Sequence, residues 1–101
     1  MSDEELQTNT PQEILEKAND LISGARATQH GDYTVLHKKV ADMWSAYLGH
    51  PISPSEVAFC MVLLKGARSK VGSYNEDDGN DGTAYAALWG ALDALEEVKE
   101  P

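Results

Sequence analysis

The sequence predicts an all-α domain, an up-down bundle of four main helices. Two observations support this prediction. Apolar residues recur at three- and four-residue spacing through four segments, and no segment shows the alternation of period two that a strand needs. Two of the segments also open with the same helix-start signal, a capping box with proline at the first helical position. The helices are expected near residues 11–27, 33–48, 54–71 and 82–98.

The first helix is expected to begin after Thr10, because Pro11 and Glu13 complete the capping box. Its apolar face is formed by Ile14, Leu15, Ala18, Leu21 and Ile22. Two ends are compatible with the sequence: Gly24 terminates the helix, or the helix runs on to about Thr28.

The second helix follows a turn at His30-Gly31-Asp32, with Asp32 or Thr34 as its cap and Gly49 as its stop. We expect its buried face to comprise Leu36, Val40, Met43, Trp44, Tyr47 and Leu48.

The third helix begins at the second capping box, Ser53-Pro54-Ser55-Glu56, and ends at Gly72. Its expected apolar face is Val57, Cys60, Met61, Leu64, Ala67 and Val71. A polar loop is expected from Ser73 to Gly82, and the fourth helix then starts near Asp81–Thr83. Its expected buried face is Tyr85, Leu88, Trp89, Leu92 and Leu95, with Trp44 and Trp89 as core anchors.

Composition limits the classes of protein that fit. The 101 residues suffice for one domain, expected over residues 10–99 after a disordered acidic tail at 1–9. The net charge of −9 argues against direct nucleic-acid binding, and no apolar stretch is long enough to span a membrane. A single cysteine, Cys60, excludes an intrachain disulfide and fits a reducing compartment. Because the core of such a small domain is thin, we expect a homo-oligomer, most simply a dimer.

The charge is unevenly distributed. Residues 24–73 carry six basic and three acidic side chains, between two acidic arms. In an up-down bundle the first and third loops lie at the same end. Candidate ligand-binding side chains are therefore expected together at that end, namely Arg26, His30, Asp32, Tyr33, Lys65, Arg68, Asp81 and Tyr85.

Lys65 and Arg68 lie three residues apart and so share a helix face. One interpretation is a phosphate clamp, because arginine presents a fixed fork of donors that matches phosphate. The other is a structural ion pair between Arg68 and Asp78 or Asp81. Asp77, Asp78 and Asp81 can supply oxygen ligands to Mg²⁺, and the alternative is a turn followed by a helix cap.

A family resemblance follows from the order of the motifs. The chain carries Arg26, then His30-Gly31-Asp32-Tyr33, Trp44-Ser45-Ala46-Tyr47-Leu48-Gly49, Ile52-Ser53-Pro54-Ser55-Glu56-Val57-Ala58, the run from Met61 to Arg68, and Asp78, Asp81 and Tyr85. Over roughly residues 13–95 it resembles a group of small uncharacterised helical proteins encoded by phages and prophages. It also resembles, more weakly, a phage domain associated with nucleotide modification, through Lys65, Arg68, Asp81 and Tyr85.

A third comparison is with the all-helical nucleoside triphosphate pyrophosphohydrolases, which carry Glu-x-x-Glu on one helix and Glu-x-x-Asp on the next. The chain has Glu13-x-x-Glu16 but lacks the second motif, and Glu13 is explained by capping. The resemblances thus imply a phage accessory protein of the bacterial cytoplasm, without a catalytic signature. It would bind a nucleotide-like phosphorylated ligand, for example to sequester a signalling nucleotide against host defence. The alternatives are an acidic inhibitor of a host nucleic-acid-binding or defence enzyme, and a divergent pyrophosphohydrolase.

Overall fold

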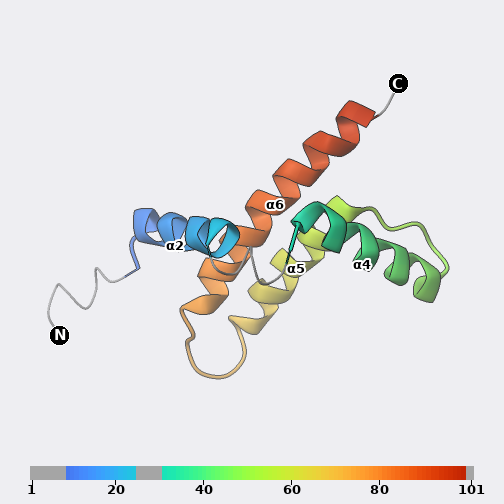
Figure 1. The fold of residues 1–101 in the computed structure, drawn as a ribbon. Helices are drawn as coiled ribbons and strands as arrows, with labels where there is room; N and C mark the ends of the chain where they lie inside the picture. The colour runs from blue at the N-terminus through green and yellow to red at the C-terminus, as the bar shows by residue number, and fades with distance from the viewer. Residues whose placement is uncertain (1–8, 25–30, 100–101) are drawn as a thin grey trace, which may run out of the picture.

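The computed structural model describes residues 9–24 and 31–99, and within these ranges it contains four α-helices and no strand (Figure 1). They are α2 (Pro11–Ser23), α4 (Tyr33–Leu48), α5 (Pro54–Arg68) and α6 (Asp77–Lys99). The predicted all-α fold of four main helices is confirmed. Residues 1–8 of the acidic tail predicted at 1–9, and Arg26 and His30, lie outside the described residues. No helix within the described ranges is long and apolar enough to cross a membrane.

The helices α5 and α6 form an antiparallel hairpin, which is the most extensive helix contact of the chain. The other two helices pack on this hairpin separately: α2 contacts α6, and α4 contacts α5. Figure 1 shows α6 as the long central helix, with α2 and α4 on opposite sides of it. The bundle is therefore open, since each outer helix has one main neighbour.

Both predicted capping boxes are present. The Glu13 amide donates to Thr10 Oγ1 at 3.2 Å, and the Thr10 amide donates to Glu13 Oε1 at 3.1 Å. The same reciprocal pair joins Ser53 and Glu56 at 2.8 and 3.2 Å. These bonds satisfy amides that the first helical turn leaves without intrahelical partners. The hydrogen bonds from the Thr10 amide and then its hydroxyl lower the pKa of the Glu13 carboxyl.

The fourth helix begins earlier than predicted, at Asp77, so that the expected loop Ser73–Gly82 is helical over its second half. The cause is Asn75, whose side-chain Oδ1 accepts from the Asp77 amide at 3.0 Å. Its carbonyl accepts from the Asp78 amide at 3.1 Å. This cap and the two acidic residues in the first turn offset the cost of Gly79 and Gly82, about 1 kcal/mol each in a helix interior.

Two helices are shorter than the ranges predicted for them, 11–27 and 54–71. α2 ends at Ser23, which agrees with the earlier of the two ends that the sequence allows. At this end the Gly24 amide donates to the Asp20 carbonyl at 2.9 Å. α5 ends at Arg68 rather than at residue 71. There the Ser69 hydroxyl donates to the Gly66 carbonyl at 2.7 Å, and the chain continues as a turn.

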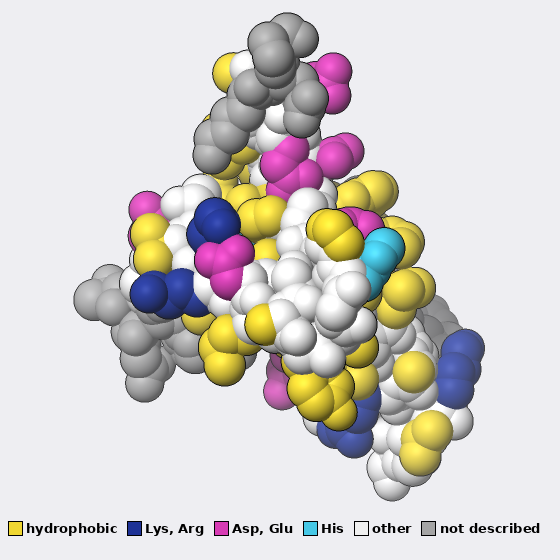
Figure 2. Space-filling view, turned by 90° about the vertical axis from the view of Figure 1, so that its right-hand side faces the viewer, with side chains coloured by type: hydrophobic (Ala, Val, Ile, Leu, Met, Phe, Trp, Pro, Cys, Tyr) yellow, Lys and Arg dark blue, Asp and Glu magenta, His cyan; other side chains and the backbone are white. Residues whose placement is uncertain are grey.

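The core consists of small side chains. The buried hydrophobic residues of the described ranges are Ala18, Ala41, Val57, Ala58, Ala84 and Leu92. Larger apolar side chains lie on the surface, as the scattered hydrophobic atoms in Figure 2 show. The predicted buried face of α4 is therefore wrong at Met43 and Tyr47, which are 71% and 89% exposed, because α4 packs on α5 through His37 and Ala41.

Further predictions of burial need correction. Leu36 and Leu48 of the predicted α4 face and Leu95 of the predicted α6 face are exposed as well. Cys60 is exposed, because α5 turns Val57 and Ala58 rather than Cys60 into the core. Trp89 is 39% exposed and packs against Phe59, with the ring centroids 5.0 Å apart. The aromatic pair therefore bridges α5 and α6 at the rim of the core rather than inside it.

A long-range hydrogen-bond pair fixes the open end of the α5–α6 hairpin. The carboxylate of Glu96 on α6 accepts from the Ser55 amide at 2.9 Å and from the Ser55 hydroxyl at 2.7 Å. Ser55 is buried at the first turn of α5, so a carboxylate from another helix satisfies its amide and complements the helix dipole.

Replacing Glu96 by Ala is expected to destabilise the fold by about 1.5–3 kcal/mol, the range for hydrogen bonds to charged groups. The matched control is Glu97→Ala on the adjacent, exposed position, which should change stability by less than about 0.5 kcal/mol. Urea unfolding followed by circular dichroism measures both. Equal effects of the two substitutions would show that the contact with Ser55 contributes nothing specific.

Candidate functional site

The polar side chains of interest lie where the second half of α5 faces the first half of α6. The helices approach closely at Gly82, where an added Cβ would lie 3.6 Å from the Cβ of Lys65. The Lys65 ammonium contacts Asp81 Oδ2 at 3.1 Å, and the two side chains are only 23% and 18% exposed. A largely buried ion pair therefore crosses the helix contact at this point.

One hollow borders this ion pair at Lys65, and a second hollow adjoins the first. The first is a shallow pocket of about 410 Å³, lined by Val62, Lys65, Gly66, Ser69, Asp78, Gly79, Gly82, Thr83 and Ala86. The second, of about 250 Å³, is lined by Asn9, Ile14, Ser69, Tyr74, Asn75, Glu76, Asp78 and Gly79. Ser69, Asp78 and Gly79 line both, so they form the boundary between the two hollows. We call the two hollows and their lining the α5–α6 polar face.

Asp78 is the most unusual group of the α5–α6 polar face. It is only 7% exposed, and no described residue donates a hydrogen bond to its carboxylate. Two residues further along α6, Asn80 is 5% exposed and its buried Oδ1 has no partner among the described residues. Among the described residues only Asn80 Oδ1 is a fully buried polar side-chain atom without a partner, so the Asp78 carboxylate keeps access to the two hollows that it lines. It can therefore accept a hydrogen bond from an external partner.

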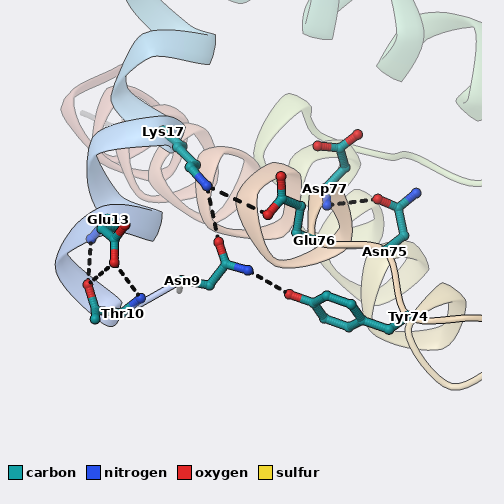
Figure 3. Close-up of polar contacts among 8 residues, drawn as sticks. All are labelled: Asn9, Thr10, Glu13, Lys17, Tyr74, Asn75, Glu76 and Asp77. Carbon is teal, nitrogen blue, oxygen red and sulfur yellow. Dashed lines mark hydrogen bonds and ion pairs between the residues drawn. The ribbon is translucent and has the colours of Figure 1, made fainter. Parts of the chain in front are cut away.

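The start of α2 closes the second hollow (Figure 3). Asn9 donates through Nδ2 to the Tyr74 hydroxyl at 2.9 Å and accepts from Lys17 Nζ at 3.1 Å. Lys17 also lies 3.7 Å from Glu76 Oε2. Sequence reasoning missed Asn9 and Tyr74, because a bond across 65 residues leaves no local pattern. The one local hint is that Asn9 adopts φ of 68°, a conformation asparagine tolerates better than most residues.

The structure brings two of the predicted site residues, Lys65 and Asp81, into direct contact, and it leaves Arg68 outside this ion pair. Asp81 pairs with Lys65, and Tyr85 lies half-buried one turn further along α6. Arg68 is exposed at the last position of α5 and makes no ion pair with the described residues. The structural ion pair considered for Arg68 therefore belongs to Lys65 instead.

Asp32 and Tyr33 lie elsewhere. The first turn of α4 lines a third hollow, of about 430 Å³, in which Thr34 and Val35 face Pro54 and Leu92. Pro54 begins α5 and lies roughly 16 Å along the helix from Lys65. The start of α4 therefore does not share an end with the ion pair. Asp32 caps α4, and the hydroxyl and amide of Thr34 lower the pKa of its carboxyl.

The three aspartates predicted as metal ligands are not brought together. Asp77 is exposed, Asp78 is buried, and Asp81 is held by Lys65. Within residues 9–24 and 31–99 no group of three or more histidine, cysteine or acidic side chains is arranged to hold a metal ion. Any cation at this face would need ligands from another molecule in addition to one or two carboxylates.

Comparison with known proteins gives a family and two relatives. Residues 13–93 match the family described as a domain of unknown function, DUF6378. The chain is 35% identical over 89 residues to the Gene 55 protein of Mycobacterium phage L5, covering 87% of the chain and 57% of that protein. It is 40% identical over 73 residues to the Gene 55 protein of Mycobacterium phage D29, covering 72% and 48%. The chain thus spans about half the length of these relatives. No solved structure is significantly similar.

Replacing Lys65 by Met should destabilise the fold by about 1–3 kcal/mol, because the largely buried Asp81 loses its only ion-pair partner in the described chain. The control is Lys38→Met, which removes an exposed pair with Asp42 at 2.7 Å. Although that contact is shorter, its loss should cost about 0.5 kcal/mol or less, because solvent screens it. Thermal unfolding compares the two variants, and a larger loss for Lys38→Met would refute this ranking by burial.

Proposed function

Since the chain belongs to the DUF6378 family, which has no assigned activity, we propose a function from the α5–α6 polar face. The domain is a phage accessory module that binds a nucleotide or nucleotide-like phosphorylated ligand there. The phage origin of the two Gene 55 relatives supports the biological setting. Sequestration of a signalling nucleotide in the cytoplasm of the infected host is the role that this binding would serve.

The observation that carries the proposal is the carboxylate of Asp78. Asp78 is only 7% exposed, lines both hollows and accepts no hydrogen bond from the described chain, beside the ion pair of Lys65 and Asp81. Carboxylates that face a hollow and find a partner only when a ligand binds are typical of functional sites.

The charges at the face decide the form of the ligand. Of the described residues, Lys65 is the one cation that lines the face, with Arg68 three residues further along α5, whereas Glu76 and Asp78 line it and Asp81 pairs with Lys65. Two positive charges therefore stand against three negative ones. A bare phosphate would therefore meet net repulsion, whereas a Mg²⁺–phosphate complex would not. Because Mg²⁺ binds through one or two carboxylates plus phosphate oxygens, Asp78 and Asp81 suffice on the protein side. Asp81 would turn from Lys65 to the cation, and Lys65 and Arg68 would contact the phosphate oxygens.

A second candidate function rests on a different surface. The acidic side chains of α2 and of the second half of α6, among them Glu16, Asp20, Asp93 and Glu97, are exposed. Figure 2 shows acidic side chains gathered toward the end of the molecule where α6 terminates. Such a surface fits an inhibitor that occupies the nucleic-acid site of a host enzyme. Binding of this kind would weaken with salt and would not depend on Asp78.

Nucleotide hydrolysis is the third possibility, and it rests on the same face as the first. A divergent pyrophosphohydrolase would release phosphate or pyrophosphate from a nucleoside triphosphate in the presence of Mg²⁺, whereas a sequestering protein would leave the ligand intact. Product analysis after prolonged incubation with the ligand therefore separates these two activities.

The binding proposal is tested by thermal unfolding with mono-, di- and cyclic nucleotides, each with Mg²⁺ or with a chelator. A ligand at ten times its Kd stabilises the folded state by about 1.4 kcal/mol. For a domain of this size, that corresponds to a rise of about 6–10 °C in Tm. The rise should require Mg²⁺ and should be lost in Arg68→Ala, while Lys70→Ala, an exposed cation two residues away, should retain it.

Replacing Asp78 by Asn separates a ligand role from a structural role. If Asp78 is kept for a ligand, the variant should unfold at a higher temperature than the wild type and should no longer respond to Mg²⁺ and nucleotide. If Asp78 only complements the dipole at the start of α6, the variant should be less stable. A less stable Asp78→Asn variant, together with a wild type whose Tm does not rise with any nucleotide, would refute the proposal and favour the acidic inhibitor.

A further inference from the structure

The helix α4 carries an unpartnered apolar stripe. Leu36, Val40, Met43 and Tyr47 follow one another at spacings of four, three and four residues, which places them on one side of the helix. Leu36, Met43 and Tyr47 are 41%, 71% and 89% exposed, and Val40 is half-buried. We call these four residues the α4 stripe.

No described residue outside α4 is seen to cover the α4 stripe, because α4 contacts α5 through a different side, that of the buried His37 and Ala41. The last turn of α4 also projects beyond that contact. The segment after Gly49 folds back along α4, and the Ile52 amide donates to Ser45 Oγ at 2.8 Å. Figure 1 shows the end of α4 pointing away from the other helices, with the returning segment beside it.

We propose that the α4 stripe is the interface of a homodimer, in which it packs against the same stripe of a second copy. The stripe alternates spacings of four and three residues, as the apolar a and d positions of the heptad repeat do in paired helices. Two such stripes can pack side chain between side chain, so one copy of the stripe complements another. A patch that pairs with itself closes the assembly at two copies.

Charge favours a second copy as the occupant. The stripe is uncharged, and α4 carries Lys38 and Lys39 against Asp42. By contrast, α6 carries six acidic residues against Lys99. Each chain has a net charge of −9, so two copies repel each other. Pairing through α4 reduces this repulsion, because it uses one of the least acidic helices and keeps the acidic helices α2 and α6 of the two copies apart.

The available area matches a small dimer interface. From the exposed fractions, the stripe offers on the order of 350 Å² of apolar surface per copy. Two copies with the polar rim then bury roughly 1,000 Å², the lower bound for a specific protein interface. A weak, reversible dimer follows, and it requires no residue of the α5–α6 polar face.

The test is sedimentation of the wild type and of Met43→Glu over about 1–500 µM, the range in which weak dimers dissociate. The wild type should shift with concentration from 11.0 kDa to twice that mass. Met43→Glu should raise the dimer dissociation constant at least about tenfold, because pairing would bury an uncompensated charge. Tyr47→Gln should weaken the dimer without adding charge.

The matched control is Val98→Glu, which adds the same charge at an apolar position that is 81% exposed on α6. It should dimerise like the wild type, and circular dichroism should show that all three variants keep their helix content. A wild type that remains at 11.0 kDa throughout refutes the proposal and assigns the stripe to another partner. Equal effects of Met43→Glu and Val98→Glu would refute it as well, because general charge repulsion would then explain both.

Discussion

The size of the side chains between the helices governs the rest of this structure. The buried hydrophobic positions of the described ranges are mostly alanine, and the contact between α5 and α6 includes Gly82. Small side chains let helices approach closely, but they bury little apolar area per residue. The fold therefore depends on directional contacts at the two ends of the α5–α6 hairpin, which are Glu96 with Ser55 at one end and Lys65 with Asp81 at the other.

This constraint links the two surfaces to which we assign roles. Where α5 and α6 separate beyond Gly82, no large apolar side chain fills the space, so polar side chains line it and Asp78 is left without a partner in the described chain. On the other side of the hairpin, α4 packs through His37 and Ala41, and its larger apolar side chains remain exposed. A ligand and a second copy would each supply contacts that the thin core does not.

Local patterns allowed much of the fold to be predicted. The capping boxes at Thr10 and Ser53 fixed two helix starts, and Gly49, with φ of 68°, fixed one helix end. Each of these signals involves residues within one turn of each other. The start of α6 was missed because the glycines at 79 and 82 suggested a loop, although Asn75 was a recognisable cap.

The candidate site was less predictable, because it depends on which faces the helices turn toward one another. The spacing of Lys65 and Asp81 marked them as candidates, but their pairing with each other, and the exposure of Arg68, follow from the rotation of α5 against α6. Hydrophobic spacing also misassigned α4, since a stripe that binds another molecule has the same pattern as one that packs inside the chain. Asn9 and Tyr74 meet only in three dimensions.

Binding of a Mg²⁺–phosphoryl group at the α5–α6 polar face is tested most directly by two-dimensional ¹H–¹⁵N NMR during titration with ADP and Mg²⁺, because each backbone amide reports its own environment. We predict that the amide signals of Ser69, Gly79 and Gly82, which line the face, shift only when both components are present. Val35 and Leu95, which line the distant hollow beside α4, should remain in place. Shifts that centre on this distant hollow, or that arise equally without Mg²⁺, would contradict such binding at the α5–α6 polar face.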